Sequence, residues 1–128
     1  MILVDTSAWI DFFRGAGSLA ERVDDLPEND QAALCGPVLT EIRRGLRSRA
    51  ERTRVLPLLA GCHLLEQPAA LWEEAGELGW YLGRRGAIVK SFDLLIAAYA
   101  LGHAVPILSA DRDFALMRRA GLGILIEP

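Results

Sequence analysis

The stretch MILVDTSAWIDFF (1–13) decides the fold. Residues 2–4 are apolar and show no alternation with polar residues, which is typical of a short strand buried on both faces. Asp5 ends this strand. Thr6 or Ser7 can cap the helix that follows, and the helix should end at Gly15. The sequence therefore predicts a buried strand that ends in a carboxylate, directly before a helix.

The same alternation of strand and helix continues along the chain. Short apolar segments predict strands, and helical spacing or capping signals predict helices. Strands are expected at 32–36, 63–66, 105–109 and 124–127. Helices are expected at 18–26 (ending before Pro27), at 37–49 with a continuation as helix over 50–61, and at 69–86, 91–103 and 111–121. Such alternation predicts an α/β fold with a parallel sheet that helices cover on both faces.

Length and composition limit the class of protein. The chain has 128 residues, of which 52% are hydrophobic, so we expect one domain over 1–128 with a full core. The net charge of -3 argues against a general nucleic-acid coat protein. Cys35 and Cys62 form no CxxC pair, which disfavours a disulfide framework or a zinc site. No apolar segment is long enough to span a bilayer, so we expect a cytoplasmic protein without membrane contact.

Four acidic residues are predicted to meet at one edge of the sheet. In parallel sheets, ligands bind outside the carboxyl ends of the strands. Asp5 and Asp111 follow predicted strands, Asp93 opens a buried helix, and Glu41 lies one turn into the helix that starts at Pro37. Each acid also has a simpler explanation, as a helix cap, a first-turn acid or a solvated side chain.

A cluster of these four acids would need a counter-charge. Two like charges about 4 Å apart repel by roughly 4 kcal/mol at an effective dielectric near 20. Oxygen ligands without His or Cys favour Mg²⁺ or Mn²⁺. Such a site suits phosphoryl transfer or phosphodiester hydrolysis, in which the metal activates a water molecule. The sequence has no GxSxG, Walker A or GxGxxG motif for acyl transfer, P-loop hydrolysis or dinucleotide binding.

Four ordered motifs resemble the PIN-domain ribonucleases, particularly the VapC-type toxins of type II toxin–antitoxin pairs. They are VDTSAWIDF (4–12), TEIRRG (40–45), SFDLLIAAYA (91–100) and ILSADRDF (107–114), and the likeness covers essentially the whole chain. The resemblance implies a three-layer α/β/α sandwich with a central parallel sheet. It also implies RNA cleavage with Mg²⁺ or Mn²⁺, a homodimer, and a small VapB-type antitoxin that holds the protein inactive.

The resemblance also assigns roles to residues. Asp5, Glu41, Asp93 and Asp111 become the catalytic and metal-binding set, in which Asp5 and Asp93 are expected to be the main ligands. The hydroxyl side chains of Thr6 and Ser109 are expected to support this set. Asp113 stays open: it can cap the last helix or reach the metal through water.

The segment RRGLRSRAERTR (43–54) is strongly basic, with six arginines against one glutamate. It begins just after Glu41, so the basic face and the acidic site should adjoin. Three interpretations stay open: contacts to RNA phosphates, a solvated helix face, or docking of an acidic antitoxin segment. Trp72, Trp80 and Tyr81 are expected to pack in the core or against a second copy.

We therefore predict a Mg²⁺-dependent endoribonuclease. One alternative is a PIN-like module of weak activity that acts only by binding its antitoxin. A less favoured alternative is a phospho-accepting receiver domain, since ILVD also begins such domains. Receiver domains resemble one another in a paired acid after the first strand and a late Lys, whereas here Thr6 follows Asp5 and no Lys follows Lys90.

Overall fold

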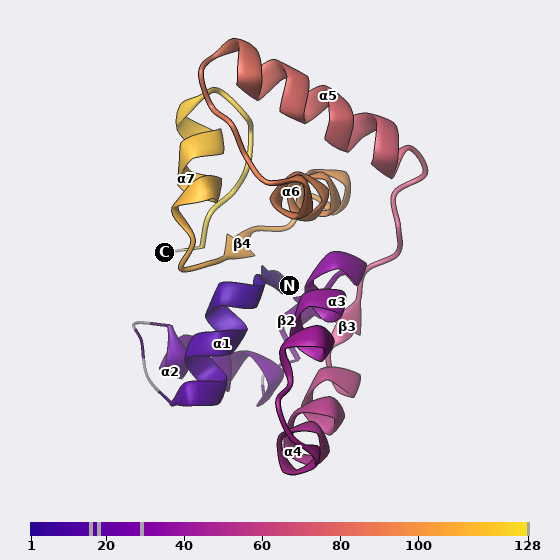
Figure 1. Ribbon diagram of the computed structural model, residues 1–128, viewed down its shortest axis with the longest axis vertical. Helices are drawn as coiled ribbons and strands as arrows, with labels where there is room; N and C mark the ends of the chain where they lie inside the picture. The colour runs from indigo at the N-terminus through magenta and orange to yellow at the C-terminus, as the bar shows by residue number, and fades with distance from the viewer. Residues whose placement is uncertain (16, 18, 29, 128) are drawn as a thin grey trace.

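In the part of the chain that the structure describes, four strands form one parallel sheet in the order β3–β2–β1–β4. The computed structural model describes residues 1–15, 17, 19–28 and 30–127, and Figure 1 shows their arrangement. In the central strand, Leu3 lies opposite Ala33 on one side and Ile107 on the other. The strands are β1 (Ile2–Val4), β2 (Ala32–Leu34), β3 (His63–Leu64) and β4 (Ile107–Leu108).

Helices connect the strands and cover the sheet. They are α1 (Thr6–Arg14), α2 (Ala20–Glu28), α3 (Gly36–Gly45), α4 (Arg49–Ala60), α5 (Leu71–Arg84), α6 (Ser91–His103) and α7 (Arg112–Arg119). In Figure 1, α5, α6 and α7 lie in the upper half and α1 to α4 in the lower half, with β4 between the two halves and β2 and β3 beside α3. The predicted parallel sheet between helical layers is confirmed.

The core lies between the sheet and its helices. Leu3 and Val4 of β1 have no exposed surface, as expected for a central strand covered on both faces. Trp9 of α1 and Ile96 of α6 are also fully buried. Burying a side chain of this size stabilises the fold by about 1.5–3 kcal/mol. Trp9 is therefore a core residue.

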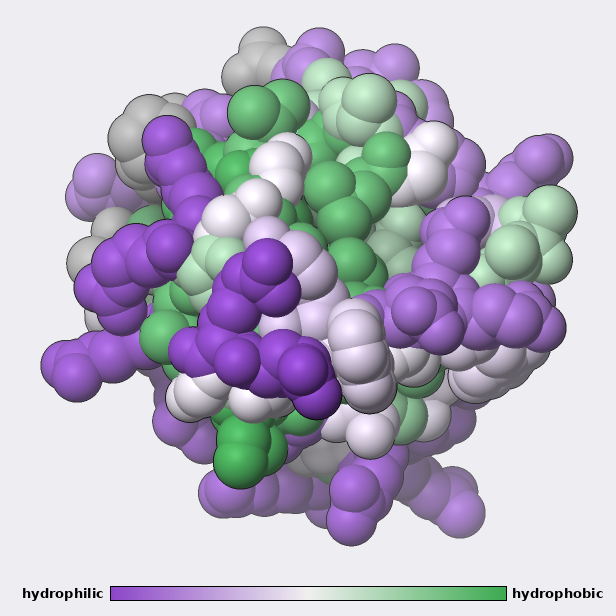
Figure 2. Space-filling view, turned by 90° about the horizontal axis from the view of Figure 1, so that it is seen from above, coloured by the Kyte–Doolittle hydropathy of each residue, from purple (hydrophilic) through white to green (hydrophobic). Residues whose placement is uncertain are grey.

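The surface on the α5 side is mixed in character. Seen from above α5, hydrophobic residues form part of the outer surface among strongly hydrophilic ones (Figure 2). Trp72 and Trp80 are 64% and 63% exposed, so the expectation that they pack in this chain's core is wrong. Leu71, Ala75 and Leu82 supply the buried face of α5 instead.

Several predicted element boundaries shift in the structure. The cap of α1 is Asp5, whose side chain accepts a hydrogen bond from the Ser7 amide, and not Thr6 or Ser7. The helix does end at Gly15, which adopts the left-handed conformation with φ of 61°. The helix α2 continues through Pro27 instead of ending before it. The predicted last strand reduces to one bridge between Ile107 and Ile126.

The predicted helices 37–49 and 50–61 are separated by a capped break. Leu46 has an extended backbone after α3, and α4 begins at a new cap, Ser48. The Glu51 amide donates to Ser48 Oγ at 3.1 Å, and the Glu51 carboxylate accepts from the Arg47 amide at 2.6 Å. This reciprocal arrangement resembles a capping box and explains why the chain turns here.

Candidate metal centre

The strand order fixes where a site can form. The strand that follows β1 in sequence, β2, pairs with one edge of β1, and β4 pairs with the other edge. The carboxyl ends of β1 and β4 therefore flank a topological switch point, where open α/β sheets bind their ligands. Asp5 follows β1, and Ser109 and Asp111 follow β4.

Asp5 is held at this point by two serine hydroxyls. Its side chain is 3% exposed. Ser7 Oγ and Ser109 Oγ each donate to Asp5 Oδ2 at 2.8 Å. The Ser109 hydroxyl also accepts from the Asp111 amide at 2.9 Å, which ties the start of α7 to the end of β1.

A group of three carboxylates lies beside it. Asp93, Asp111 and Asp113 each offer an oxygen, and these oxygens lie within 4.8 Å of one another. Asp93 comes from the first turn of α6, while Asp111 caps α7 by accepting from the Asp113 amide at 2.9 Å. The Lys90 ammonium lies 3.9 Å from Asp111 Oδ2 and partly offsets the negative charge.

The surroundings of Asp93 disfavour its charged form. Burial raises the pKa of Asp93 to about 7, and a hydrogen bond with Asp113 adds to the rise. The negative charges of Asp111 and Asp5 act in the same direction, whereas Lys90 lowers the pKa. Asp93 Oδ2 is buried and has no hydrogen-bond partner among the described residues. A cation would satisfy this oxygen and offset the mutual repulsion.

Glu41 lies outside the three-acid group. Its Oε1 accepts a 2.9 Å hydrogen bond from Thr6 Oγ1, which joins α3 to the start of α1. Both Glu41 and Asp5 act electrostatically on Cys35, the residue after β2, although burial is the main cause that raises the pKa of that thiol to about 12. Glu41 and Asp5 therefore border the same end of the sheet.

The structure thus arranges the sequence-predicted acids in two groups. Asp93 and Asp111 belong to one group of carboxylates. Asp5 is connected to this group by the hydrogen bonds of Ser109, whereas Glu41 is outside it and accepts a hydrogen bond from Thr6. The third member of the group is Asp113, whose role the sequence left open. The sequence signal for Asp113 was its position two residues after a helix cap. This signal is weak, because the helix dipole alone favours acidic residues in the first turn of a helix.

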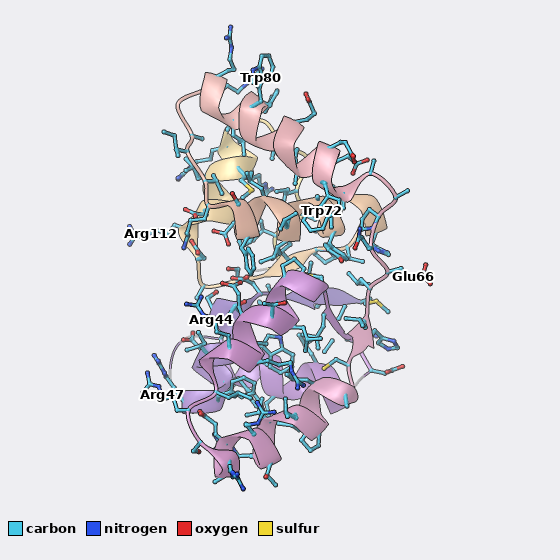
Figure 3. The ribbon with its side chains drawn as sticks, turned by 45° about the vertical axis from the view of Figure 1, so that its right-hand side comes forward. Arg44, Arg47, Glu66, Trp72, Trp80 and Arg112 are labelled. Atoms are coloured by element: carbon cyan, nitrogen blue, oxygen red, sulfur yellow. The ribbon has the colours of Figure 1, made fainter. Side chains whose placement is uncertain are left out.

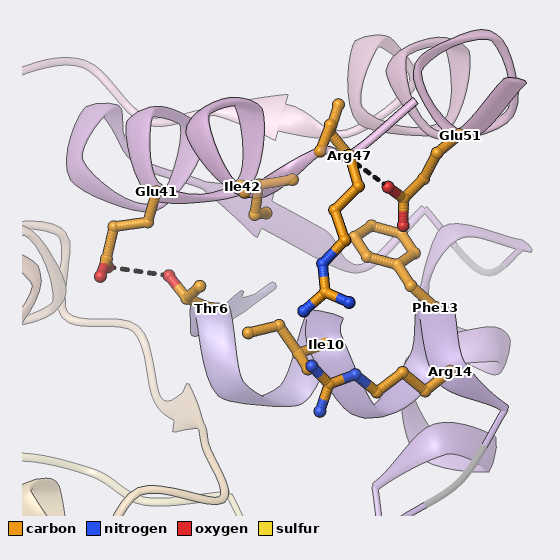
Figure 4. A pocket seen from close by; sticks show the side chains of 10 residues that line it. Thr6, Ile10, Phe13, Arg14, Glu41, Ile42, Arg47 and Glu51 are labelled. Carbon is orange, nitrogen blue, oxygen red and sulfur yellow. Dashed lines mark hydrogen bonds between the residues drawn. The ribbon is translucent and has the colours of Figure 1, made fainter. Parts of the chain in front are cut away.

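A groove runs from Thr6 and Glu41 along the space between α1 and α3 (Figure 4). Its volume is about 350 Å³. Ile10 and Phe13 of α1 and Ile42 of α3 supply apolar lining.

The donor set fits a hard divalent cation. Carboxylate oxygens at the switch point of a parallel sheet, with one oxygen unpartnered, suit Mg²⁺ or Mn²⁺ better than soft metals. The fold and the site together define an α/β/α domain whose clustered acids could hold a metal that acts on phosphate esters.

Comparisons with known proteins identify the family. The PIN domain model matches residues 2–120. VapC ribonuclease Mb1587 of Mycobacterium bovis is 36% identical over 124 residues, which cover 93% of this chain and 92% of that protein. Ribonuclease VapC11 of Mycobacterium tuberculosis matches with the same identity and coverage. This chain therefore belongs to the PIN-domain family and is related to its VapC ribonucleases.

Solved structures agree with this fold. VapBC2 from Rickettsia felis, bound to a DNA fragment from its promoter, matches with a TM-score of 0.79 at 22% identity, covering 99% of this chain and 98% of that one. The DNA-bound VapBC from Salmonella typhimurium matches with a TM-score of 0.77 at 20% identity, covering 98% and 96%. Among the described residues, no helix has the length and apolar character needed to cross a membrane.

Proposed function

We propose that this protein is a divalent-metal-dependent endoribonuclease, the toxic component of a type II toxin–antitoxin pair. The observation that carries the proposal is the group of carboxylates from Asp93, Asp111 and Asp113, which lies beside Asp5 at the switch point of the sheet. Membership of the PIN-domain family and 36% identity to VapC ribonucleases support RNA as the substrate.

Asp5, Asp93, Asp111 and Glu41 form the proposed catalytic and metal-binding set, to which the geometry adds Asp113. A bound divalent ion would polarise a phosphoryl oxygen, lower the pKa of the attacking water and stabilise the leaving oxygen. We propose Mg²⁺ as the resident ion, with Mn²⁺ as a substitute, because the donors are all oxygens.

The chain's own residues set the geometry of the site. Ser7 and Ser109 fix the rotamer of Asp5 through two 2.8 Å hydrogen bonds. The Thr6 hydroxyl donates to Glu41 and holds it at the same end of the sheet as Asp5. Burial raises the pKa of Asp93 to about 7 in the metal-free protein, so a metal ion would compete with a proton for this carboxylate at neutral pH.

The test compares RNA cleavage and metal binding in matched variants. Asp5→Ala and Asp93→Ala should lose cleavage in Mn²⁺ or Mg²⁺, and EDTA should abolish cleavage by the unaltered protein. Mn²⁺ should raise the melting temperature of the unaltered protein and of Glu66→Ala, but not of Asp5→Ala. Glu66 is a suitable control because it is exposed on the other side of the molecule from Arg44 and Arg112 (Figure 3).

Cleavage at the unaltered rate in both active-site variants would reject this assignment. Metal-dependent cleavage by the unaltered protein separates an enzyme from the alternative, a PIN-like module that acts only by binding. We propose a VapB-type antitoxin as the partner, because the similar solved structures include VapBC2 from Rickettsia felis and a toxin–antitoxin complex from Klebsiella pneumoniae. Co-purification with a small neighbouring gene product tests that partner. The cytoplasmic location stays a prediction.

We also propose that a second copy packs on α5. Trp72 and Trp80 are exposed on this helix, and a Cβ atom added at Gly76 between them would meet no described atom within 4 Å apart from its chain neighbours and the backbone of its own helix. The helix carries Glu73 and Glu74 in its first turn and Arg84 in its last. Two antiparallel copies of α5 would therefore place acidic turns against basic ones, with the tryptophans beside the close approach.

A further inference from the structure

We infer that the groove between α1 and α3 binds a phosphate of the RNA strand next to the bond that is cleaved, through the guanidinium groups of Arg14 and Arg47. The inference deepens the proposed function, on which it rests. It names two side chains outside the acidic site and the chemical group that they recognise.

Two guanidinium groups converge in this groove from different elements. Arg14 ends α1, and Arg47 lies in the connection between α3 and α4. Figure 4 shows both side chains extending into the groove with their guanidinium groups facing one another. Both groups are cationic, so an anion between them would offset their mutual repulsion.

The acids of the groove are already engaged. Glu41 accepts the Thr6 hydroxyl at 2.9 Å, and Glu51 accepts the Arg47 main-chain amide at 2.6 Å. Figure 4 shows the Arg47 guanidinium pointing away from the Glu51 carboxylate. In the part of the chain that the structure describes, no carboxylate lies within ion-pair distance of Arg14 or Arg47. These two groups are therefore available to an external anion.

The groove leads from the acidic site into the basic segment. One end holds Thr6 and Glu41 at the border of the site, and the other end holds Arg47. All arginines within the segment 43–54 are exposed. Figure 3 shows Arg44 and Arg47 on the side of the molecule that also carries Arg112.

Phosphodiester groups suit this arrangement better than a single isolated anion. An RNA strand whose scissile phosphate lies at the acidic site has its neighbouring phosphates a short distance along the RNA. The guanidinium groups of Arg14 and Arg47 lie in the groove at that place, where they can bind such a phosphate. The apolar side chains of Ile10 and Phe13 can contact a ribose or a base. This local charge explains how an acidic protein can hold RNA.

The experiment measures binding without cleavage. A fluorescein-labelled, single-stranded 12-mer of uridine is titrated in EDTA with the unaltered protein, Arg14→Gln, Arg47→Gln and the double variant. Each single variant should weaken binding by about tenfold. The slope of log affinity against log salt should fall by about 0.7 for each phosphate that the variant no longer neutralises. Arg118→Gln and Arg119→Gln, which change exposed arginines in the last turn of α7, should bind as the unaltered protein does.

Unchanged RNA affinity and salt slope in the double variant would overturn the inference. Unchanged RNA binding with weakened binding of a copurified antitoxin would also overturn it, in favour of a protein occupant of the groove. Equal losses in the α7 controls would show only a general charge effect and would likewise reject it. Because binding is read in EDTA, a failure of the proposed nuclease activity appears separately, as absent cleavage by the unaltered protein in Mn²⁺.

Discussion

The Ser109 hydroxyl donates a 2.8 Å hydrogen bond to Oδ2 of Asp5, which lies 104 positions earlier in the chain. The same oxygen of Ser109 accepts the amide of Asp111 at 2.9 Å. One small side chain therefore connects the ends of two neighbouring strands and the start of α7. This connection places a buried carboxylate beside the group formed by Asp93, Asp111 and Asp113.

Removing the Ser109 hydroxyl should lower both the stability of the fold and the affinity for a metal ion, the affinity more strongly. In Ser109→Ala, the Asp5 carboxylate loses one donor and the Asp111 amide loses its acceptor, so we expect a stability loss of about 1 kcal/mol. We expect Mn²⁺ affinity to fall by about tenfold, as is typical when partners of metal ligands are removed. Urea denaturation and a Mn²⁺ melting-temperature titration measure the two effects. Ser109→Thr keeps the hydroxyl and should retain both properties; equal losses in the two variants would argue against the hydrogen bond.

The contribution of Asp93 to the stability of the metal-free protein should fall as the pH rises from about 4 to 7. The pKa of Asp93 is raised to about 7 in the folded state, whereas an unfolded Asp titrates near 4. The folded state therefore holds this proton more tightly, and the stabilisation is complete below the unfolded pKa and lost as the pH rises through the folded pKa. Urea denaturation in EDTA across this range measures the slope.

The contribution of Asp93 is isolated by comparison with Asp93→Asn. This variant carries no titrating group at the position, so its stability should fall less between pH 4 and 7. At pH 8 it should be more stable than the unaltered metal-free protein by roughly 1–4 kcal/mol, the range for neighbouring like charges at effective dielectrics between 80 and 20. Parallel pH profiles in the two proteins would rule out this role for Asp93.

The sequence predicted the sheet, and it predicted that Asp5 and Asp111 follow strands, because both features follow from local patterns. Apolar runs that end in Asp5 and near Asp111 mark strand ends, and parallel strands bring such ends to one edge. The role of Asp113 could not be read in this way, because its carboxylate joins Asp93 only through the packing of α7 near α6. The break between α3 and α4 was missed because its signal, Ser48 followed by Glu51, lies inside a run of helix-forming residues.

Asp113 should contribute to metal binding and not to capping. Its carboxylate lies in the three-acid group, while the cap of α7 is made by Asp111. We therefore expect Asp113→Asn to lower Mn²⁺ affinity by about tenfold with little change in the stability of the metal-free protein. Isothermal titration with Mn²⁺ measures the affinity, and Asp24→Asn, at an exposed position in α2, is the control.

Asp111→Asn sharpens this comparison, because Asn caps helices about as well as Asp and the change removes only the charge. It should also weaken Mn²⁺ binding without unfolding α7. Unaltered Mn²⁺ affinity in both Asp111→Asn and Asp113→Asn would remove these carboxylates from the proposed site.

Exposed tryptophans on α5 predict the effect of a single glycine substitution on assembly. Gly76 lies between Trp72 and Trp80, and among the described residues a Cβ atom there would meet nothing within 4 Å beyond its chain neighbours and the backbone of α5. Gly76→Leu should stabilise the isolated helix by roughly 1 kcal/mol, because glycine is a poor helix former, yet it should block the close approach of a second α5.

Light scattering should then give the mass of one chain for Gly76→Leu and for Trp80→Ser, and twice that mass for the unaltered protein. Leu64→Ser changes a similarly exposed apolar residue on β3 and should remain dimeric. A dimer that persists in Gly76→Leu and Trp80→Ser would mean that the two copies meet through another surface.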